Sequence, residues 1–245
     1  MKIALIGYGK MGRAIERHAM DRGHEIVCRV DADNISDIES AAFKSADVAI
    51  EFTMPSAGCD NCLRAMASGV PVVSGTTGWN DRLEEVKRVC DTGDGTLMWS
   101  SNFSIGVNLF MSLNRYLTRL MAPFTQYRPS MTEVHHVHKL DHPSGTAITL
   151  AQGIIDNDPA VNEWTEDPTD DTSKLVIAHE RRGEVPGIHT IKWESAVDSI
   201  TITHDAKSRD GFALGAVMAA EWLAGKKGFH TIDEFINDLI SGAEK

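Results

Sequence analysis

Short apolar runs alternate with segments of helical spacing through the first third of the chain. The runs that read as strands lie at 2–7, 24–31, 46–53, 70–78 and 95–103. Three of the intervening segments, at 11–23, 55–69 and 81–93, have apolar residues at helical spacing and end in glycine. Strands that alternate with helices predict a parallel sheet with helices on both faces.

The middle of the chain follows a different pattern. It predicts a helix at 107–124, a strand at 130–139, a helix at 146–156 and an exposed acidic loop at 157–174, followed by three strands of a meander at 174–182, 187–195 and 198–206. A further helix is expected at 212–225. The predicted fold class is therefore α/β. A Rossmann-like parallel-sheet domain spans 1–103 and 211–245, and an α+β domain with a mixed open sheet spans 104–210.

Charge and composition exclude several classes of partner. The formal net charge is −11, which argues against nucleic acid and anionic membrane surfaces as partners. No run approaches the length of a membrane span, and the N-terminus does not resemble a signal peptide, so we expect a cytoplasmic protein. The four cysteines are too scattered for a disulfide framework, and Cys59 and Cys62 are expected to be buried thiols.

A glycine pattern follows the first predicted strand and opens the first predicted helix. Gly7, Tyr8, Gly9, Lys10, Met11 and Gly12 match G-x-G-x-x-G. The first glycine permits a tight turn, the second lets the backbone approach a pyrophosphate, and the third lets helix and strand pack closely. The pattern predicts a dinucleotide site, although the same glycines could form an ordinary turn.

Asp31 ends the second predicted strand, where an acidic residue accepts hydrogen bonds from the adenosine ribose. A carboxylate at this place repels a 2′-phosphate, so NADH is favoured over NADPH. Arg29 and Lys10 are close in sequence and could relieve that repulsion, which leaves both cofactors open.

Two later segments follow the fourth and fifth predicted strands. They are Gly75, Thr76 and Thr77, and Ser100, Ser101, Asn102 and Phe103. Because ligands of an open parallel sheet bind beyond the carboxyl ends of its strands, both segments are expected to line the nicotinamide half. Ordinary turn chemistry is the alternative.

The stretch EVHHVHKLDHPSGTA, residues 133–147, has an unusual density of proton carriers. A metal site is disfavoured because lysine is a poor ligand, and we expect no metal here. A partly buried polar strand is a second interpretation. The third is an anion site in which Lys139 or a histidine donates a proton and Asp141 positions Lys139 by an ion pair.

The residues after this strand favour the third interpretation. Pro143, Ser144, Gly145 and Thr146 precede a helical pattern, and a helix start offers capping positions and free N–H groups to a carboxylate. A nicotinamide domain combined with a cationic, acid-donating pocket fits reduction of a small unsaturated dicarboxylate.

The whole stretch 133–147 resembles the substrate motif of the 4-hydroxy-tetrahydrodipicolinate reductase (dihydrodipicolinate reductase) family. The resemblance extends over nearly the whole chain through IGYGKMGR, EFTMPSA, VVSGTTGW, SSNFSIGVN, RRGEVPGIH and SRDGFALGAVMAAEWL. It implies NAD(P)H-dependent reduction of 4-hydroxy-tetrahydrodipicolinate to tetrahydrodipicolinate in lysine and diaminopimelate biosynthesis. It also implies a homotetramer assembled through the sheets of the substrate domains.

The resemblance further implies the roles of individual residues. His135 would be the catalytic proton donor or acceptor and Lys139 the second proton donor. His136 would contact substrate, and Gly145 and Thr146, next to Ser144, would bind a substrate carboxylate. The glycine loop, Asp31 and the two later segments would bind cofactor. Asp31 is followed by Ala32 where many family members have arginine, and this favours NADH.

Two other hypotheses compete with this assignment. A different two-domain reductase, such as a semialdehyde or homoserine dehydrogenase, would need a nucleophilic cysteine or a lysine–acid pair in another context, and none of the cysteines lies in the second predicted domain. A nucleotide-sensing protein without catalysis would explain the glycine loop but would leave residues 133–147 without a task.

Overall fold

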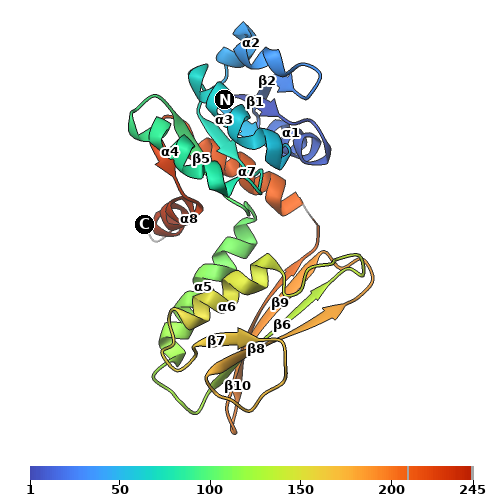
Figure 1. Cartoon of the computed structure of the whole chain (residues 1–245), viewed down its shortest axis with the longest axis vertical. Coiled ribbons are helices and arrows are strands. Elements are labelled where there is room, and N and C mark those ends of the chain that lie inside the picture. Colours follow the sequence, from blue (N-terminus) through green and yellow to red (C-terminus); the bar gives the residue numbers. More distant parts are fainter. Residues whose placement is uncertain (209, 244–245) are drawn as a thin grey trace. The chain divides into compact units, whose positions relative to one another are not determined.

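The computed structural model describes residues 1–208 and 210–243, which form two compact units (Figure 1). Unit 1 contains Met1–Asn108 and the described chain from Asp210 onward, and unit 2 contains the described chain from Leu109. Position 209 and the last two residues were included in the predicted domain ranges and lie outside the described residues. Each unit has its own sheet and its own core.

In the described residues, unit 1 contains a parallel sheet of six strands. They are β1 (Lys2–Ile6), β2 (Glu25–Val30), β3 (Val48–Glu51), β4 (Val72–Ser74), β5 (Thr96–Trp99) and β11 (Gly228–His230), in the order β11-β5-β4-β3-β1-β2. Strand β2 pairs with one side of β1, and β3, the next strand along the chain, pairs with its other side. The carboxyl ends of β1 and β3 therefore flank a topological switch point, the usual ligand position of such sheets.

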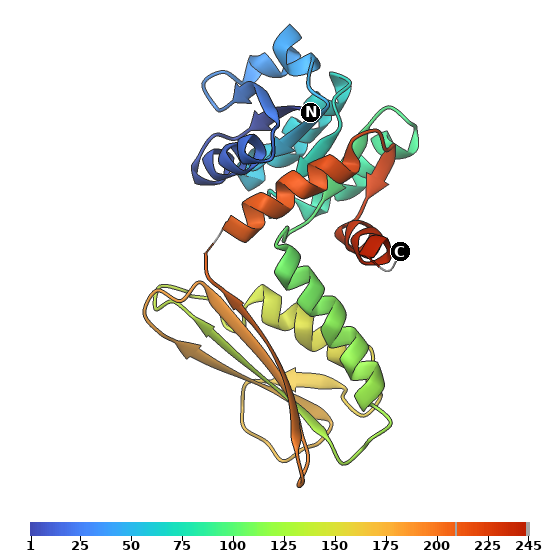
Figure 2. The same ribbon diagram turned by 180° about the vertical axis from the view of Figure 1, so that it is seen from behind.

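Helices cover both faces of this sheet (Figure 2). The first face packs against α1 (Lys10–Asp21), α7 (Asp210–Leu223) and α8 (Ile232–Ala243), and the second against α2 (Ala41–Lys44), α3 (Pro55–Ala67) and α4 (Leu83–Asp91). On α1, Ile15 and Ala19 are four residues apart and fully buried, as helical spacing predicts. Two short 3₁₀ turns, Ile35–Glu39 and Asn80–Arg82, complete the unit. The predicted α/β, Rossmann-like class is confirmed.

The cysteines lie in the core of unit 1 as free, buried thiols, as predicted. Cys59 and Cys62 are on α3 and face the same hydrophobic cluster, and burial raises the pKa of both thiols. A thiol whose pKa is raised carries little thiolate at neutral pH, so these side chains act as small apolar groups.

Unit 2 contains a mixed sheet with two helices on one face. Its described strands are β6 (Arg128–His135), β7 (Glu163–Thr165), β8 (Lys174–Arg181), β9 (Gly187–Glu194) and β10 (Ser199–Ala206), in the order β10-β9-β6-β8-β7. Helices α5 (Ile105–Met121) and α6 (Gly145–Ile155) pack on this sheet in one hydrophobic cluster with Trp193, α5 through Phe110 and Met121 and α6 through Leu150 and Ile154. This is the mixed sheet that the second fold pattern predicted.

Three predictions for unit 2 were wrong in detail. The last three strands do not form a meander, because β6 lies between β8 and β9 and pairs with β8 in parallel and with β9 antiparallel. The strand predicted at 130–139 ends at His135, where Lys139 N–H bonds back to the His136 carbonyl in a turn. The acidic segment 157–174 is not wholly a loop, since β7 lies inside it and pairs with β8, which begins at its last residue. Strand periodicity identifies strands but does not identify their neighbours.

None of the helices in the described part of the chain combines the length and apolar character that crossing a bilayer requires.

Candidate functional site

The glycine turn of unit 1 is shaped by two close backbone approaches. Gly7 has φ +92°, and a Cβ there would lie 2.0 Å from the Phe52 carbonyl oxygen. A Cβ on Gly12 would lie 2.2 Å from the Gly7 carbonyl oxygen, so only glycine lets α1 pack against the end of β1. At Gly9 a Cβ would meet no protein atom within 4 Å, which leaves this backbone open to a ligand.

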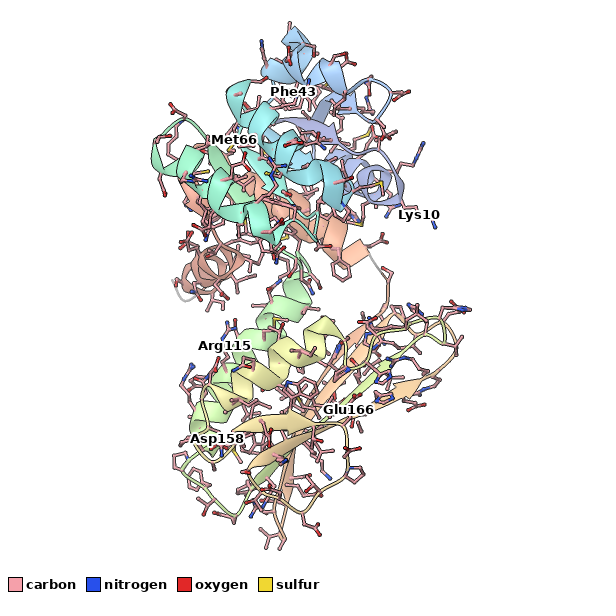
Figure 3. All side chains as sticks on the ribbon, viewed as in Figure 1. Lys10, Phe43, Met66, Arg115, Asp158 and Glu166 are labelled. Carbon is pink, nitrogen blue, oxygen red and sulfur yellow. The ribbon has the colours of Figure 1, made fainter. Side chains whose placement is uncertain are left out.

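A cavity of about 460 Å³ lies at the carboxyl edge of β1, β2 and β3. Of the residues predicted to bind cofactor, it is lined by Gly7, Tyr8, Gly9 and Asp31. Lys10 and Met11 begin α1 outside this lining, and Figure 3 shows the Lys10 side chain extending away from the ribbon. The sequence prediction missed the part of the wall that Phe52, Thr53 and Met54 form after β3. The sequence feature that could have identified these three residues is their position directly after a buried strand.

The Asp31 carboxylate is fixed by main-chain donors at the rim of this cavity. The N–H of Ala32 donates to Oδ1 at 2.9 Å and the N–H of Tyr8 donates to Oδ2 at 3.3 Å. Arg29, a candidate for relieving the negative charge here, is instead paired with Glu16, to which its Nε donates at 3.0 Å. The neighbouring guanidinium is therefore engaged by Glu16 and not by the Asp31 carboxylate at the cavity rim.

The segments after β4 and β5 divide between a second hollow and the core. Thr77 and Ser101 line a hollow of about 430 Å³ beside Trp99. By contrast, a Cβ on Gly75 would collide with the Phe52 ring at 2.2 Å, and Thr76, Ser100 and Phe103 are buried. In the loop, Ser100 Oγ accepts from the Asn102 N–H at 3.1 Å. Gly75, Thr76, Ser100 and Phe103 therefore shape the loops more than they present side chains to a ligand.

A buried carboxylate that the sequence analysis did not single out joins the loops after β3 and β4. Glu51, the last residue of β3, is fully buried and accepts from Ser74 Oγ at 2.6 Å, from Thr76 Oγ1 at 2.7 Å and from Thr53 Oγ1. Thr53 N–H in turn donates to Thr76 Oγ1 at 2.7 Å. Burial raises the pKa of Glu51, and the hydroxyl donors offset part of that rise. Glu51 thus orders two walls of the cofactor edge.

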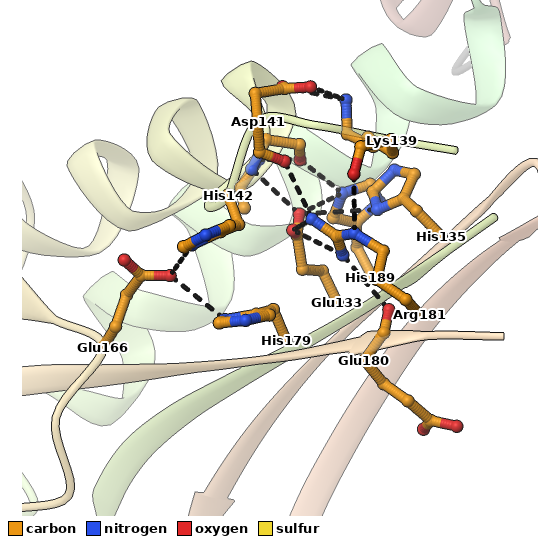
Figure 4. Close-up of polar contacts among 12 residues, drawn as sticks. Glu133, His135, Lys139, Asp141, His142, Glu166, His179, Glu180, Arg181 and His189 are labelled. Atoms are coloured by element: carbon orange, nitrogen blue, oxygen red, sulfur yellow. Dashed lines mark hydrogen bonds and ion pairs between the residues drawn. The ribbon is translucent and has the colours of Figure 1, made fainter. Parts of the chain in front are cut away.

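In unit 2, Lys139 and Asp141 form the predicted ion pair in the turn after β6. Lys139 Nζ lies 2.8 Å from both carboxylate oxygens of Asp141, and this pairing lowers the pKa of Asp141 (Figure 4). The guanidinium of Arg181 holds the same turn, since it donates to the carbonyl oxygens of Asp141 at 2.8 Å and of Lys139 at 3.3 Å. The backbone of the turn that carries the Lys139 ammonium is therefore held by a side chain from β8.

Helix α6 begins at the predicted place, with Ser144 as its N-cap. Ser144 Oγ accepts from the Ala147 N–H at 3.2 Å and contacts His189 Nε2 at 3.2 Å, so the hydroxyl is occupied within the protein. Gly145 and Thr146 are the next residues, and first-turn N–H groups have no acceptor within their own helix. Gly145 is exposed, and its backbone is open to a ligand.

Glu133 is the centre of the buried polar cluster in unit 2, and the sequence analysis assigned it no role. Its carboxylate accepts from the Ser144 N–H at 3.1 Å and lies 3.4 Å from Arg181 NH1, 3.6 Å from His135 Nδ1 and 3.7 Å from His189 Nε2. Burial would raise the pKa of Glu133, but hydrogen bonds from His189 and Ser144 outweigh it and lower the pKa to about 2. A buried anion thus links β6, β8, β9 and α6.

His135 is buried at the end of β6 beside this anion. Burial lowers the pKa of His135 to about 4, although the Glu133 charge opposes the shift. Its Nδ1 has no hydrogen-bond partner among residues 1–208 and 210–243. His136 is half-buried, and its Nδ1 also has no such partner there, whereas His138 is exposed and pairs with Glu184 at 3.2 Å. At neutral pH the His135 ring is therefore neutral imidazole.

Comparison with known proteins finds the same family for both parts of the chain that carry these sites. The family models for the N-terminus and the C-terminus of dihydrodipicolinate reductase match residues 1–103 and 106–236. A 4-hydroxy-tetrahydrodipicolinate reductase from Christiangramia forsetii is 44% identical over 98% of this chain and 99% of its own length. A second, from Archaeoglobus fulgidus, is 34% identical over 96% of this chain and 100% of its own length.

A solved structure, dipicolinate-bound dihydrodipicolinate reductase from Paenisporosarcina sp. TG-14, has the same fold. It covers 94% of this chain and 97% of its own with a TM-score of 0.76 and 21% sequence identity. The glycine turn lies inside the first range matched by the family models, and the Lys139 cluster lies inside the second. The chain therefore belongs to the dihydrodipicolinate reductase family.

Proposed function

We propose that this chain catalyses the NAD(P)H-dependent reduction of 4-hydroxy-tetrahydrodipicolinate to tetrahydrodipicolinate in lysine and diaminopimelate biosynthesis. Its curated relatives carry the name of this activity over nearly their whole length. The observation that carries the proposal is the cluster in unit 2 that combines Lys139, His135 and the start of α6 around one buried anion.

Each part of the unit 2 cluster has a distinct task. The N–H groups of Gly145 and Thr146 at the start of α6 bind one substrate carboxylate, with Ser144 shaping the turn, and His136 contacts the substrate nearby. Lys139, held by Asp141, delivers the proton. Glu133 and Arg181 are positioning residues, because they fix the Lys139 turn and the imidazole without needing to touch substrate.

His135 acts in its neutral form. With a pKa of about 4 it is deprotonated at neutral pH, so it accepts or relays a proton and Lys139 is the charged donor. This narrows the expectation from the family resemblance, which left His135 as either donor or acceptor of a proton. A reduced nicotinamide, when bound, would supply a hydride to the substrate ring. In the net reaction the hydride and one proton remove the 4-hydroxyl group as water, and Lys139, which delivers the proton, regains it from solvent.

Unit 1 supplies the cofactor site. The open backbone at Gly9 and the start of α1, with Lys10, Met11 and Gly12, suit a pyrophosphate, and Asp31 suits the adenosine ribose. Thr77 and Ser101 line the hollow suited to the nicotinamide half. Gly75, Thr76, Ser100, Asn102 and Phe103 support these loops. A homotetramer, which the family resemblance implies, and a cytoplasmic location, which the sequence features predict, are further predictions.

Replacing Lys139 tests the assignment of the reaction. We expect Lys139→Ala to lower turnover by about 10²- to 10⁴-fold, the usual range for a lost general acid, while NADH binds as before. Turnover is measured with the condensation product of pyruvate and aspartate semialdehyde, and NADH binding by fluorescence titration. Lys174→Ala is the matched control, since Lys174 forms a surface pair with Glu163 at 2.8 Å. Undiminished turnover in Lys139→Ala would show that Lys139 is not the acid.

Cofactor preference depends on Asp31, and we propose that NADH is preferred. The carboxylate is held by main-chain N–H groups, and Arg29 is engaged by Glu16. We expect Asp31→Ser to shift the ratio of kcat/KM for NADPH over NADH upward by about tenfold, equivalent to about 1.4 kcal/mol of relieved repulsion. Steady-state kinetics with each cofactor measure the ratio. A ratio that stays constant would exclude Asp31 as the discriminating group.

A further inference from the structure

A second cluster of imidazole and carboxylate groups lies in unit 2, apart from the Lys139 pair. His142 lies in the loop before α6, Glu166 directly follows β7, and His179 is on β8. Oε1 of Glu166 lies 2.8 Å from His142 Nδ1 and 3.0 Å from His179 Nδ1, as Figure 4 shows. The three atoms all lie within 4.8 Å of one another.

The two rings are aligned on the same carboxylate. The imidazoles of His142 and His179 stack with a centroid distance of 4.4 Å and an interplanar angle of 18°. Each ring directs its Nδ1 toward the same oxygen atom of Glu166. Two imidazole nitrogens and one carboxylate oxygen are the donor set of many zinc sites. Metal–ligand bonds in such sites are about 2.0–2.2 Å long, so the donor atoms around a bound zinc lie slightly farther apart than the hydrogen-bonded atoms here.

We propose that His142, Glu166 and His179 form a binding site for a divalent transition cation of the zinc class. The cation would take the place of the close Nδ1–carboxylate contacts between the imidazoles and Glu166, and water would complete its coordination. The side chains are 51%, 30% and 36% exposed, so an ion and its water can reach the site after folding. Residue spacing does not reveal this site, because the ligands lie at widely separated positions on three segments.

The surroundings favour a cation at this cluster. Glu163 lies on β7, and Asp167, Asp170 and Asp171 follow Glu166 in the acidic segment, so the local sequence is negative. These groups and the net charge of −11 raise the local concentration of cations. A bound ion would fasten the loop that carries His142 to β8.

The other group with metal-ligand geometry is less suited. Glu133, His135 and His189 are buried, and the Glu133 carboxylate is already held by the Ser144 N–H and by Arg181. An ion there would have to displace a buried guanidinium contact. In the exposed cluster each Nδ1 needs only to present its lone pair to the ion, as it does in the imidazole tautomer that carries its proton on Nε2.

Zinc titration of the full chain after chelator treatment tests the proposal. We expect wild type to bind one zinc ion per chain by calorimetry and to gain thermal stability in its presence. His179→Ala and Glu166→Gln should each weaken the affinity by at least about tenfold and abolish the thermal shift, as loss of one ligand predicts. Because both measurements detect binding directly, they do not depend on the proposed enzymatic activity.

Two further variants locate the ion. His230→Ala is the matched control, since His230 pairs with Glu234 at 2.9 Å in unit 1 and is not one of the proposed ligands, and it should bind zinc as wild type does. His189→Ala should also leave binding intact. The proposal is overturned if wild type binds no zinc, if His179→Ala binds as tightly as wild type, or if only His189→Ala loses the ion.

Discussion

Each unit holds one glutamate that is fully buried near the carboxyl end of a central strand, yet the two carboxylates are stabilised differently. Glu51 in unit 1 accepts from the hydroxyls of serine and threonine, and its pKa is raised by burial. Glu133 in unit 2 faces Arg181, two imidazoles and a peptide N–H, and its pKa is lowered to about 2. The hydroxyl donors at Glu51 offset only part of the desolvation cost, whereas the hydrogen bonds from His189 and Ser144 outweigh it at Glu133.

The contrast matches what each unit has to do. Around Glu51 the polar groups connect the loops after β3 and β4, and the ligand-facing surface above them is mostly backbone and apolar side chain. Around Glu133 the same residue type fixes charged side chains, including the Arg181 that holds the Lys139 turn. A site for a cofactor needs ordered loops, while a site for proton transfer needs ordered charges.

The largest expected effect is from truncating Glu133. Glu133→Ala leaves Arg181 and the Ser144 N–H without their buried acceptor, so we expect the free energy of unfolding to fall by about 3 kcal/mol. Urea denaturation at neutral pH measures it. Glu180→Ala is the control, because Glu180 forms an exposed pair with Arg182 and its loss should change stability little. Equal effects of the two variants would contradict the central position of Glu133.

The next effect concerns pH: Glu133 and Glu51 should make opposite contributions to the pH dependence of the free energy of unfolding. Because the pKa of Glu133 falls from 4.5 unfolded to about 2 folded, its contribution is present above pH 4.5 and is lost as pH falls toward 2. His135, whose pKa falls from 6.5 to about 4, also costs stability as pH falls, but its window lies between pH 6.5 and about 4. Glu51 has a raised pKa, so its contribution is largest below 4.5 and is lost as pH rises through its folded value.

Two conservative variants separate these contributions. Glu133→Gln should flatten the acid loss of stability, while Glu51→Gln should steepen it, because glutamine removes each titration and keeps a similar shape. Each unit of pKa shift corresponds to about 1.4 kcal/mol across its window. Denaturation midpoints over a pH series measure both slopes. Slopes that change in the same direction in both variants would remove the distinction between the two glutamates.

The smallest expected effect concerns one hydroxyl of the Glu51 network. Ser74→Ala removes the donor to Glu51 Oε2 and should cost about 1 kcal/mol of unfolding free energy. Ser74 does not line the cavity, so NADH affinity should be unchanged. In a Glu51→Ala background the same substitution should cost much less, and a full additive cost there would show that Ser74 acts independently of Glu51.

Local pattern was enough to predict much of this protein. The alternation of strands and helices identified the parallel sheet, and G-x-G-x-x-G identified the turn in which Gly7 and Gly12 approach the backbone. The Lys139–Asp141 pair and the Ser144 cap were also predicted, because their partners are two or three residues away. Interactions of such short range depend on sequence spacing.

Tertiary structure alone decided the order of strands in unit 2 and the partners of the buried carboxylates. Glu133 meets Arg181 and His189 only because β6 lies between β8 and β9, and the sequence had suggested a meander instead. Glu51 meets Ser74 and Thr76 across neighbouring strands in the same manner. Burial and long-range pairing set the pKa of a side chain, and both depend on packing that residue spacing does not encode.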